Sequence, residues 1–249
     1  MSIEWLTPQW PAPPGVRAVS TFRGGGVSAM PYASLNLAAH VGDESAAVDA
    51  NRRRLLSAAA LPAEPAWLSQ VHGAQVADLD AAAPPGAADA AFTRQPGRVC
   101  AILAADCLPI LLAAASGGVV AAVHAGWRGL AAGVIEAAVG ALDTEPEQLI
   151  AWLGPAIGPQ RFEVGAEVRE ALLRADPQGG AAFVTNARGR FMADLPQLAR
   201  RRLSALGLTR IYDSAECTHS QPDRYFSHRR DGKCGRQATL IWLEQAQNR

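Results

Sequence analysis

The chain has 249 residues, and its 23 Lys and Arg residues balance its 23 Asp and Glu residues, so the formal net charge is zero at pH 7. This balance argues against a general nucleic-acid-binding or membrane-binding surface. The length is sufficient to bury a sizeable core, in one large domain or two small ones.

The N-terminal residues and the cysteines indicate the compartment. The opening segment, MSIEWLTPQW, lacks the basic, apolar and small-residue progression of a signal peptide. The four cysteines form no sequence cluster, which favours a reducing environment. We therefore expect a cytoplasmic protein. We expect no membrane segment, because Asp106, Pro109 and Gly117-Gly118 cut the apolar run at 99–125 below the roughly 20 residues that span a bilayer.

The first predicted strand, residues 16–22, leads into a glycine-rich loop. Arg23 stands at the end of this strand and is a candidate anion contact, and the glycines at 24–26 would let the backbone approach a ligand closely. Asn36, later in the same loop, is a candidate substrate contact. The loop does not match G-x-x-x-x-G-K-[ST], so it is not a nucleotide P-loop.

A helix and two short strands follow in the predicted order. Asp43 or Ser45 could cap a helix that runs to about Ala59. Residues 66–71 and 75–79 are strand-like, with His72 between them, and residues 81–89 read as a surface loop.

The central block, residues 99–130, predicts a buried hairpin followed by a turn and a helix. Apolar runs at 99–106 and 109–115 are followed by turn residues at 116–118 and by an apolar, β-branched run that ends at His124. A turn at residues 116–117 places Pro109 or Ile110 opposite His124 and makes Cys107 a diagonal neighbour, at roughly 7–8 Å. That separation lets two side chains share a metal ion, whereas a register slip of one residue would turn them apart.

After His124 the chain enters a glycine-containing turn and a predicted helix with apolar residues from 130 to 142. A helix N-terminus attracts anions, and the guanidinium of Arg128 is suited to phosphate. In the alternative interpretation Gly126 and Gly129 only allow tight packing, and Arg128 is a solvated side chain.

The remaining predicted elements are a strand at 149–153, a helix ending near 175, a hairpin at 183–192, a helix from Asp194 to Gly207, and strands at 210–212 and 237–243. The polar loop before the last strand carries His228, Arg229 and Arg230, and it could bind anions or be an ordinary basic turn.

His72, Cys107 and His124 each stand at a predicted strand end and could converge at one sheet edge. Two histidines and one cysteine leave the fourth tetrahedral position open, which is typical of a catalytic zinc site. The spacing alone is a weak signal, since the chain has no C-x-x-C or H-E-x-x-H motif.

Six motifs, in order along nearly the whole chain, resemble those of the laccase-domain, or YfiH-type, purine nucleoside phosphorylase family: TFRGGGVSAMPYASLNLAAHVGD, SQVHG, ADCLPILL, VHAGWRGLAAGV, GPAIGP and CTHSQPDRYFSHRRDGKCGRQATLIWL. The resemblance implies an α+β fold in one domain over residues 1–249. That fold is a layered α-β-β-α sandwich of mixed sheets, similar to the deamidase domain of cytotoxic necrotizing factor toxins.

The resemblance also implies chemistry. It implies a catalytic zinc site on His72, Cys107 and His124, and phosphorolysis of adenosine, inosine and methylthioadenosine, with adenosine deamination in the same pocket. Purine nucleosides and phosphate are then the partners. The candidate substrate and phosphate contacts are Arg23, Asn36, Arg128, Arg229 and Arg230.

Three other functions stay open. Cys107 and His124 could act as nucleophile and base of an amidase on a cell-wall precursor, with zinc as an artefact. A copper polyphenol oxidase, the family's older description, fits poorly, because the chain has five histidines and no His-x-His pair. Copper could still bind adventitiously, since copper(II) outcompetes zinc for such ligands. A non-enzymatic metal-binding or partner-binding module would need a fourth protein ligand.

Overall fold

The computed structural model describes residues 2–82 and 86–245, so residues 83–85 of the predicted loop at 81–89 lie outside the described part. A five-stranded sheet contains β1 (Trp5–Leu6), β2 (Val16–Thr21), β3 (Ala66–Trp67), β6 (Val99–Ala104) and β14 (Gln237–Leu243). A six-stranded sheet contains β4 (Val76–Asp78), β5 (Ala90–Thr93), β7 (Leu108–Ala114), β8 (Val120–Ala125), β9 (Leu149–Leu153) and β13 (Arg210–Asp213). A small third sheet contains β10 (Glu163–Val164), β11 (Phe183–Thr185) and β12 (Phe191–Ala193).

The α-helices of the described residues are α1 (Ser45–Ala58), α2 (Trp127–Ala132), α3 (Val134–Ala141), α4 (Ala166–Ala175), α5 (Leu195–Ala205) and α6 (His228–Asp231). Two 3₁₀ turns, η1 (Pro146–Gln148) and η2 (Gly179–Ala182), complete the set. No helix among the described residues has the length and apolar character to cross a membrane.

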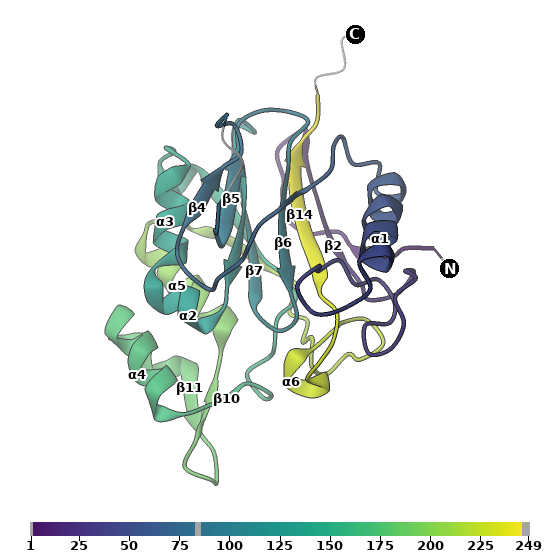
Figure 1. Cartoon of the computed structure of the whole chain (residues 1–249). Helices are drawn as coiled ribbons and strands as arrows, with labels where there is room; N and C mark the ends of the chain where they lie inside the picture. Colours follow the sequence, from purple (N-terminus) through teal and green to yellow (C-terminus); the bar gives the residue numbers. More distant parts are fainter. Residues whose placement is uncertain (1, 83–85, 246–249) are drawn as a thin grey trace.

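The two large sheets lie face to face, with α1 outside the five-stranded sheet and α2, α3 and α5 outside the six-stranded sheet (Figure 1). The strand order is β1-β2-β14-β6-β3 in one and β13-β9-β7-β8-β5-β4 in the other, and both mix parallel and antiparallel pairs. This arrangement confirms the predicted α-β-β-α sandwich of mixed sheets.

Three apolar layers hold the sandwich together. Ile102 and Trp152 belong to the layer between the sheets, Leu55 of α1 packs on the outer face of the five-stranded sheet, and Ile135 of α3 packs on the outer face of the six-stranded sheet. β6, β7, β8 and β9 are buried along their whole length, which explains why they read as continuous apolar runs.

The chain changes sheets between β6 and β7, although these strands are adjacent in sequence. β6 pairs with β14 and β3, whereas β7 pairs with β8 and β9. The crossing passes through Asp106, whose φ is +101° and whose carboxylate accepts hydrogen bonds from Thr218 Oγ1 (2.7 Å) and the Arg229 backbone N–H (2.7 Å). Cys107 therefore sits where the two sheets diverge.

The predicted hairpin register is confirmed, because Pro109 lies opposite His124 in the β7–β8 pair. The single helix predicted after this hairpin is instead broken. Gly133 adopts φ +87°, ending α2 and starting α3, a conformation that favours glycine over other residues.

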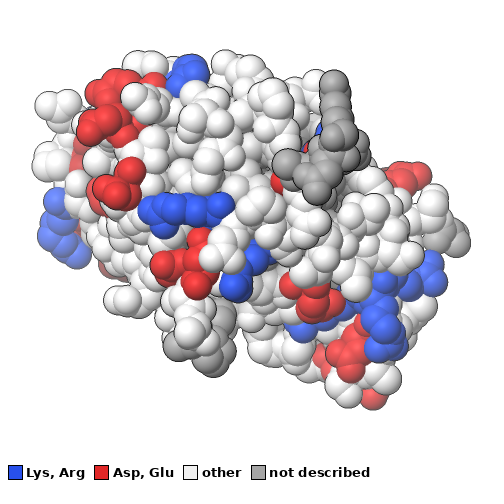
Figure 2. Space-filling view, turned by 90° about the horizontal axis from the view of Figure 1, so that it is seen from above, with Lys and Arg blue, Asp and Glu red and all other residues white. Residues whose placement is uncertain are grey.

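The surface seen from above carries Lys and Arg side chains interspersed with Asp and Glu (Figure 2). Two of the exposed basic residues, Arg17 and Arg188, form ion pairs with Glu244 and Glu163. On the face seen in Figure 2, charges of both signs are therefore intermixed rather than gathered in two separate patches.

Candidate active site

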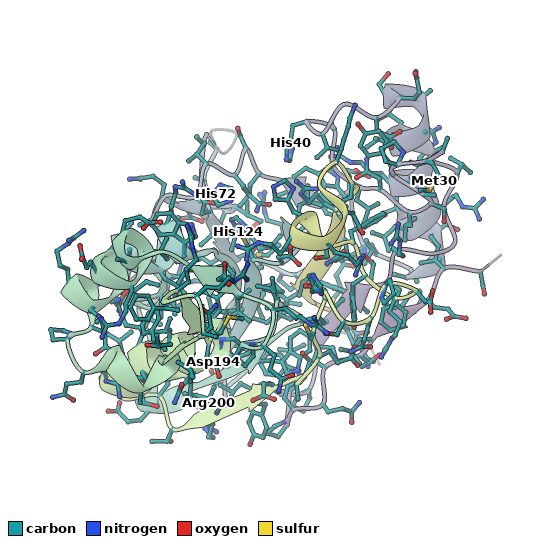
Figure 3. The ribbon with its side chains drawn as sticks, turned by 90° about the horizontal axis from the view of Figure 1, so that it is seen from below. Met30, His40, His72, His124, Asp194 and Arg200 are labelled. Carbon is teal, nitrogen blue, oxygen red and sulfur yellow. The ribbon has the colours of Figure 1, made fainter. Side chains whose placement is uncertain are left out.

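His72, Cys107 and His124 come together at one end of the sandwich. His72 lies in the turn before β4 with φ +60°, Cys107 directly precedes β7, and His124 belongs to β8. The ligand atoms of all three side chains lie within 4.8 Å of one another. Figure 3 shows His72 and His124 on neighbouring segments, and their rings meet edge to face with centroids 4.9 Å apart.

This cluster fits a zinc ion. One sulfur and two imidazole nitrogens are ligands that zinc prefers, and sulfur and nitrogen ligands of one tetrahedral zinc are about 3.6 Å apart. The separation of Cys107 Sγ and His72 Nε2 is 3.9 Å. Gly126 leaves the room that the ligands occupy, because a Cβ at this position would lie 2.8 Å from Cys107 Sγ and 3.3 Å from His72 Cδ2.

A buried carboxylate, Asp89, orients two of the three candidate ligands, and it was not predicted from the sequence. Its side chain is fully buried and accepts a hydrogen bond from His124 Nδ1 (2.8 Å). It also accepts from the backbone N–H groups of Val71 (3.1 Å), His72 (2.9 Å) and Gly73 (2.7 Å). A single acidic residue before the apolar strand β5 was the only available signal. Because Asp89 occupies Nδ1 of His124, Nε2 is left for a metal.

The electrostatics of the cluster favour a charged pair when no metal is present. Burial acts to raise the pKa of the Cys107 thiol, but the neighbouring His124 and His72 outweigh it and bring this pKa to about 6. Burial acts to lower the pKa of His124, but Cys107 and Asp89 raise it to about 9. Between these values Cys107 is a thiolate and His124 an imidazolium, so a binding metal would displace the proton of His124 Nε2.

The cluster opens into a cavity of about 340 Å³, within the range of small-molecule pockets. Besides the three candidate ligands, the polar side chains of its wall belong to His40, Gln70, Arg128, His228 and Arg236. Figure 3 shows His40, from the loop before α1, on the same side of the molecule as His72 and His124. Residues from both halves of the sandwich thus face one space.

Arg128 is the predicted substrate contact that lines this cavity. Its guanidinium stacks over the Trp127 ring at 4.3 Å from the ring centroid. Arg128 is exposed at the rim of this cavity, so its position fits an anion contact and also fits a solvated side chain.

The other predicted contacts lie outside the cavity wall. Arg23 donates to two backbone carbonyls and pairs with Asp231 (3.8 Å). Arg230 donates to three backbone carbonyls and to Asp231. Arg229 donates from its backbone to Asp106 and from Nη1 to a backbone carbonyl (2.9 Å). These three arginines hold the C-terminal loop in place.

Asn36 is also used internally. Its side chain is fully buried and exchanges hydrogen bonds with the backbone of Ala38, the carboxylate of Asp43 and the backbone N–H of Arg236. His40, Gln70 and Arg236, which line the cavity, were not predicted as contacts. Their segments lie far from the central block, and only the fold brings them to it.

Comparison with known proteins identifies related sequences. Residues 17–244 match the model of a protein family described as multi-copper polyphenol oxidoreductase laccase. The chain is 50% identical over 241 residues to the purine nucleoside phosphorylase YfiH of Escherichia coli (strain K12), covering 96% of this chain and 98% of that relative. It is 52% identical over 241 residues to a purine nucleoside phosphorylase of Pseudomonas aeruginosa, with the same coverage. A crystal structure of a Neisseria meningitidis protein, 42% identical, aligns with a TM-score of 0.91 and covers 97% of this chain and 99% of that one.

Proposed function

This chain belongs to the family described as multi-copper polyphenol oxidoreductase laccase, whose members compared above include purine nucleoside phosphorylases. We propose that it is a zinc-dependent purine nucleoside phosphorylase with adenosine deaminase activity. The proposed substrates are adenosine, inosine and methylthioadenosine. The observation that carries the proposal is the convergence of His72, Cys107 and His124 on a cavity large enough for a small ligand. The names of the relatives at about half identity support the phosphorylase class.

Each residue of the candidate site has a separate role in the proposed reactions. His72, Cys107 and His124 would hold the zinc ion, and Asp89 keeps His124 in the tautomer that presents Nε2. When bound, zinc supplies a Lewis acid that lowers the pKa of water to about 7. Arg128, on the wall of the same cavity, supplies positive charge for an anionic substrate.

In phosphorolysis an oxygen of orthophosphate forms a bond to C1′ of the nucleoside, and the bond between C1′ and the purine nitrogen breaks. The products are the free base, which takes up a proton, and ribose 1-phosphate. In deamination water replaces the amino group at C6 of adenosine, giving inosine and ammonia. Both reactions need an oxygen nucleophile placed against a purine nucleoside, so one cavity can serve both.

A copper oxidase is the less favoured function. Among residues 2–82 and 86–245 one cluster of three or more metal-ligating side chains is found, and a laccase-type centre needs ligands for several coppers.

We further propose that the chain forms one domain and acts in the cytoplasm. The shared apolar layer between the sheets supports the first proposal, and the four free thiols support the second.

Product analysis tests the proposed function. Purified protein is incubated with adenosine, with and without phosphate, beside a Cys107→Ala variant that excludes a contaminating host enzyme. Adenine that appears only with phosphate and with Cys107 supports the phosphorylase, and inosine in the same reaction supports the deaminase. If neither product depends on Cys107, the purine assignment is wrong.

A cysteine amidase is the second candidate, and a specific arrangement favours it. Cys107, His124 and Asp89 form a thiol–imidazole–carboxylate series in which Asp89 bonds His124 Nδ1 and the thiol pKa is about 6. Metal content separates the candidates. Activity that is lost on chelation and restored by zinc supports the phosphorylase, whereas full amidase activity in metal-free protein supports the amidase.

A further inference from the structure

The wall of the cavity beside the candidate metal cluster carries two guanidinium groups, those of Arg128 of α2 and Arg236 just before β14. The imidazoles of His40, from the loop before α1, and of His228, at the start of α6, line the same cavity. Among the described residues that line the cavity there is no Asp or Glu. A cavity with cationic side chains and no carboxylate favours an anionic ligand.

The guanidinium groups of Arg128 and Arg236 form no ion pair with a carboxylate among the described residues, unlike those of Arg23 and Arg230, which pair with Asp231. Arg236 is half-buried, and its Nη1 donates to the carbonyl oxygens of Cys234 (2.8 Å) and Gly235 (2.9 Å). These bonds leave its Nε and Nη2 groups as available donors. Arg128 contacts the Trp127 ring and leaves all its N–H groups available. Free guanidinium donors suit the planar, bidentate recognition of phosphate oxygens.

Arg236 is held in place before any ligand arrives. Its backbone N–H donates to Asn36 Oδ1 (3.0 Å), and Asn36 is fully buried. The amide nitrogen of Asn36 donates to the backbone oxygen of Ala38 (3.1 Å), two residues before His40. Asn36 therefore joins the segment that carries Arg236 to the loop that carries His40, so it acts as a positioning residue rather than as a substrate contact.

We propose that Arg128 and Arg236 bind the orthophosphate of the phosphorolysis reaction in this cavity, and that Asn36 positions Arg236. This inference rests on the proposed function. It moves the phosphate contact away from Arg23, Arg229 and Arg230, whose donors hold the C-terminal loop. It adds Arg236, which comes to the cluster from the other sheet.

The test uses the zinc-loaded enzyme and the variants Arg128→Gln and Arg236→Gln. Arg174→Gln is the matched control, because Arg174 is an exposed residue of α4 outside the cavity wall. Each cavity variant should raise KM for phosphate about 10- to 100-fold, the loss expected for one charge-assisted hydrogen bond. In each cavity variant, KM for phosphate should rise by a larger factor than KM for adenosine, whereas Arg174→Gln should keep both KM values and the rate of deamination within about twofold of wild type. Unchanged phosphate KM values in both variants, or equal rises for phosphate and adenosine, would overturn the assignment.

Calorimetric titration with orthophosphate separates this inference from the proposed function. If the wild type performs no phosphorolysis but binds phosphate through both arginines, the proposed function fails while the anion site stands. If the wild type binds no phosphate, the inference fails. A phosphate ester on a nucleoside offers the same oxygens, so AMP is titrated in parallel. Tighter, arginine-dependent binding of AMP would overturn the choice of orthophosphate.

A double-mutant cycle tests the role of Asn36. Asn36→Ala should raise KM for phosphate, and its effect should be non-additive with that of Arg236→Gln but additive with that of Arg128→Gln. A purely structural role would lower thermal stability without this selective coupling. Additivity with both arginine variants would refute the positioning role.

Discussion

Replacing Asp89 by Asn tests whether this carboxylate organises the cluster. Asp89 Oδ1 accepts from the His72 N–H and from His124 Nδ1, and Oδ2 accepts from the Val71 and Gly73 N–H groups. An amide has one acceptor oxygen, so two of these four donors would face an NH₂ group instead. Each buried donor left without an acceptor costs about 1–3 kcal/mol, so the free energy of unfolding should fall by about 2–6 kcal/mol.

The same substitution should weaken zinc binding about 10- to 100-fold, because it disturbs both the His124 tautomer and the turn that carries His72. Competition with a chromophoric chelator measures the affinity, and urea unfolding of the metal-free protein measures the stability. Asp80→Asn is the matched control. Asp80 accepts from Thr93 Oγ1 (2.6 Å) and the Arg94 N–H (2.7 Å), outside the cavity. It should lose stability but keep its zinc affinity. Wild-type zinc affinity in Asp89→Asn would refute the reasoning.

Two further predictions concern the cluster itself. In metal-free Cys217→Ser protein, the ultraviolet absorbance of the thiolate should rise with pH with a midpoint near pH 6, since the pKa of Cys107 is about 6. The additional substitution His124→Gln should move this midpoint to higher pH, because burial raises the thiol pKa once the imidazole is removed. An unchanged midpoint would contradict this cause. Gly126→Ala should weaken zinc binding roughly tenfold or more, since the added Cβ would lie 2.8 Å from Cys107 Sγ. In the control Gly140→Ala the added Cβ has no neighbouring atom within 4 Å, so this variant should keep its zinc affinity and stabilise α3 by about 0.5–1 kcal/mol. Equal zinc affinities in the two variants would show that the space beside Gly126 is not needed for zinc binding.

The central block shows how far local sequence carries the description of the fold. The apolar run before the turn, the turn at residues 116–118 and the apolar, β-branched run after it predicted the β7–β8 pair with Pro109 opposite His124, as observed. A hairpin is predictable because a short turn sets the register of two adjacent strands. The break at Gly133 was not predicted, since the apolar positions keep helical spacing across it.

The residues that surround the candidate site were harder to predict from the sequence. Asp89 carries no motif, and its bond to His124 joins residues 35 positions apart. Asn36 and Arg236 are 200 positions apart, and Arg23 meets Asp231 across a similar distance. The sequence does not distinguish an arginine that forms an ion pair with a carboxylate from an arginine that lines a cavity.

The sequence by itself determined the longer strands such as β2, β6, β7 and β14, the helices α1, α4 and α5, and the β7–β8 register. It also determined the residue types of the cluster formed by His72, Cys107 and His124, because periodicity and turn chemistry act over a few neighbouring residues. The tertiary structure alone decided that β6 and β7 enter different sheets, that Asp89 holds the cluster, and that Arg128 and Arg236 keep free donors. These features depend on pairings between distant segments, which form only when the apolar layers of the sandwich pack together.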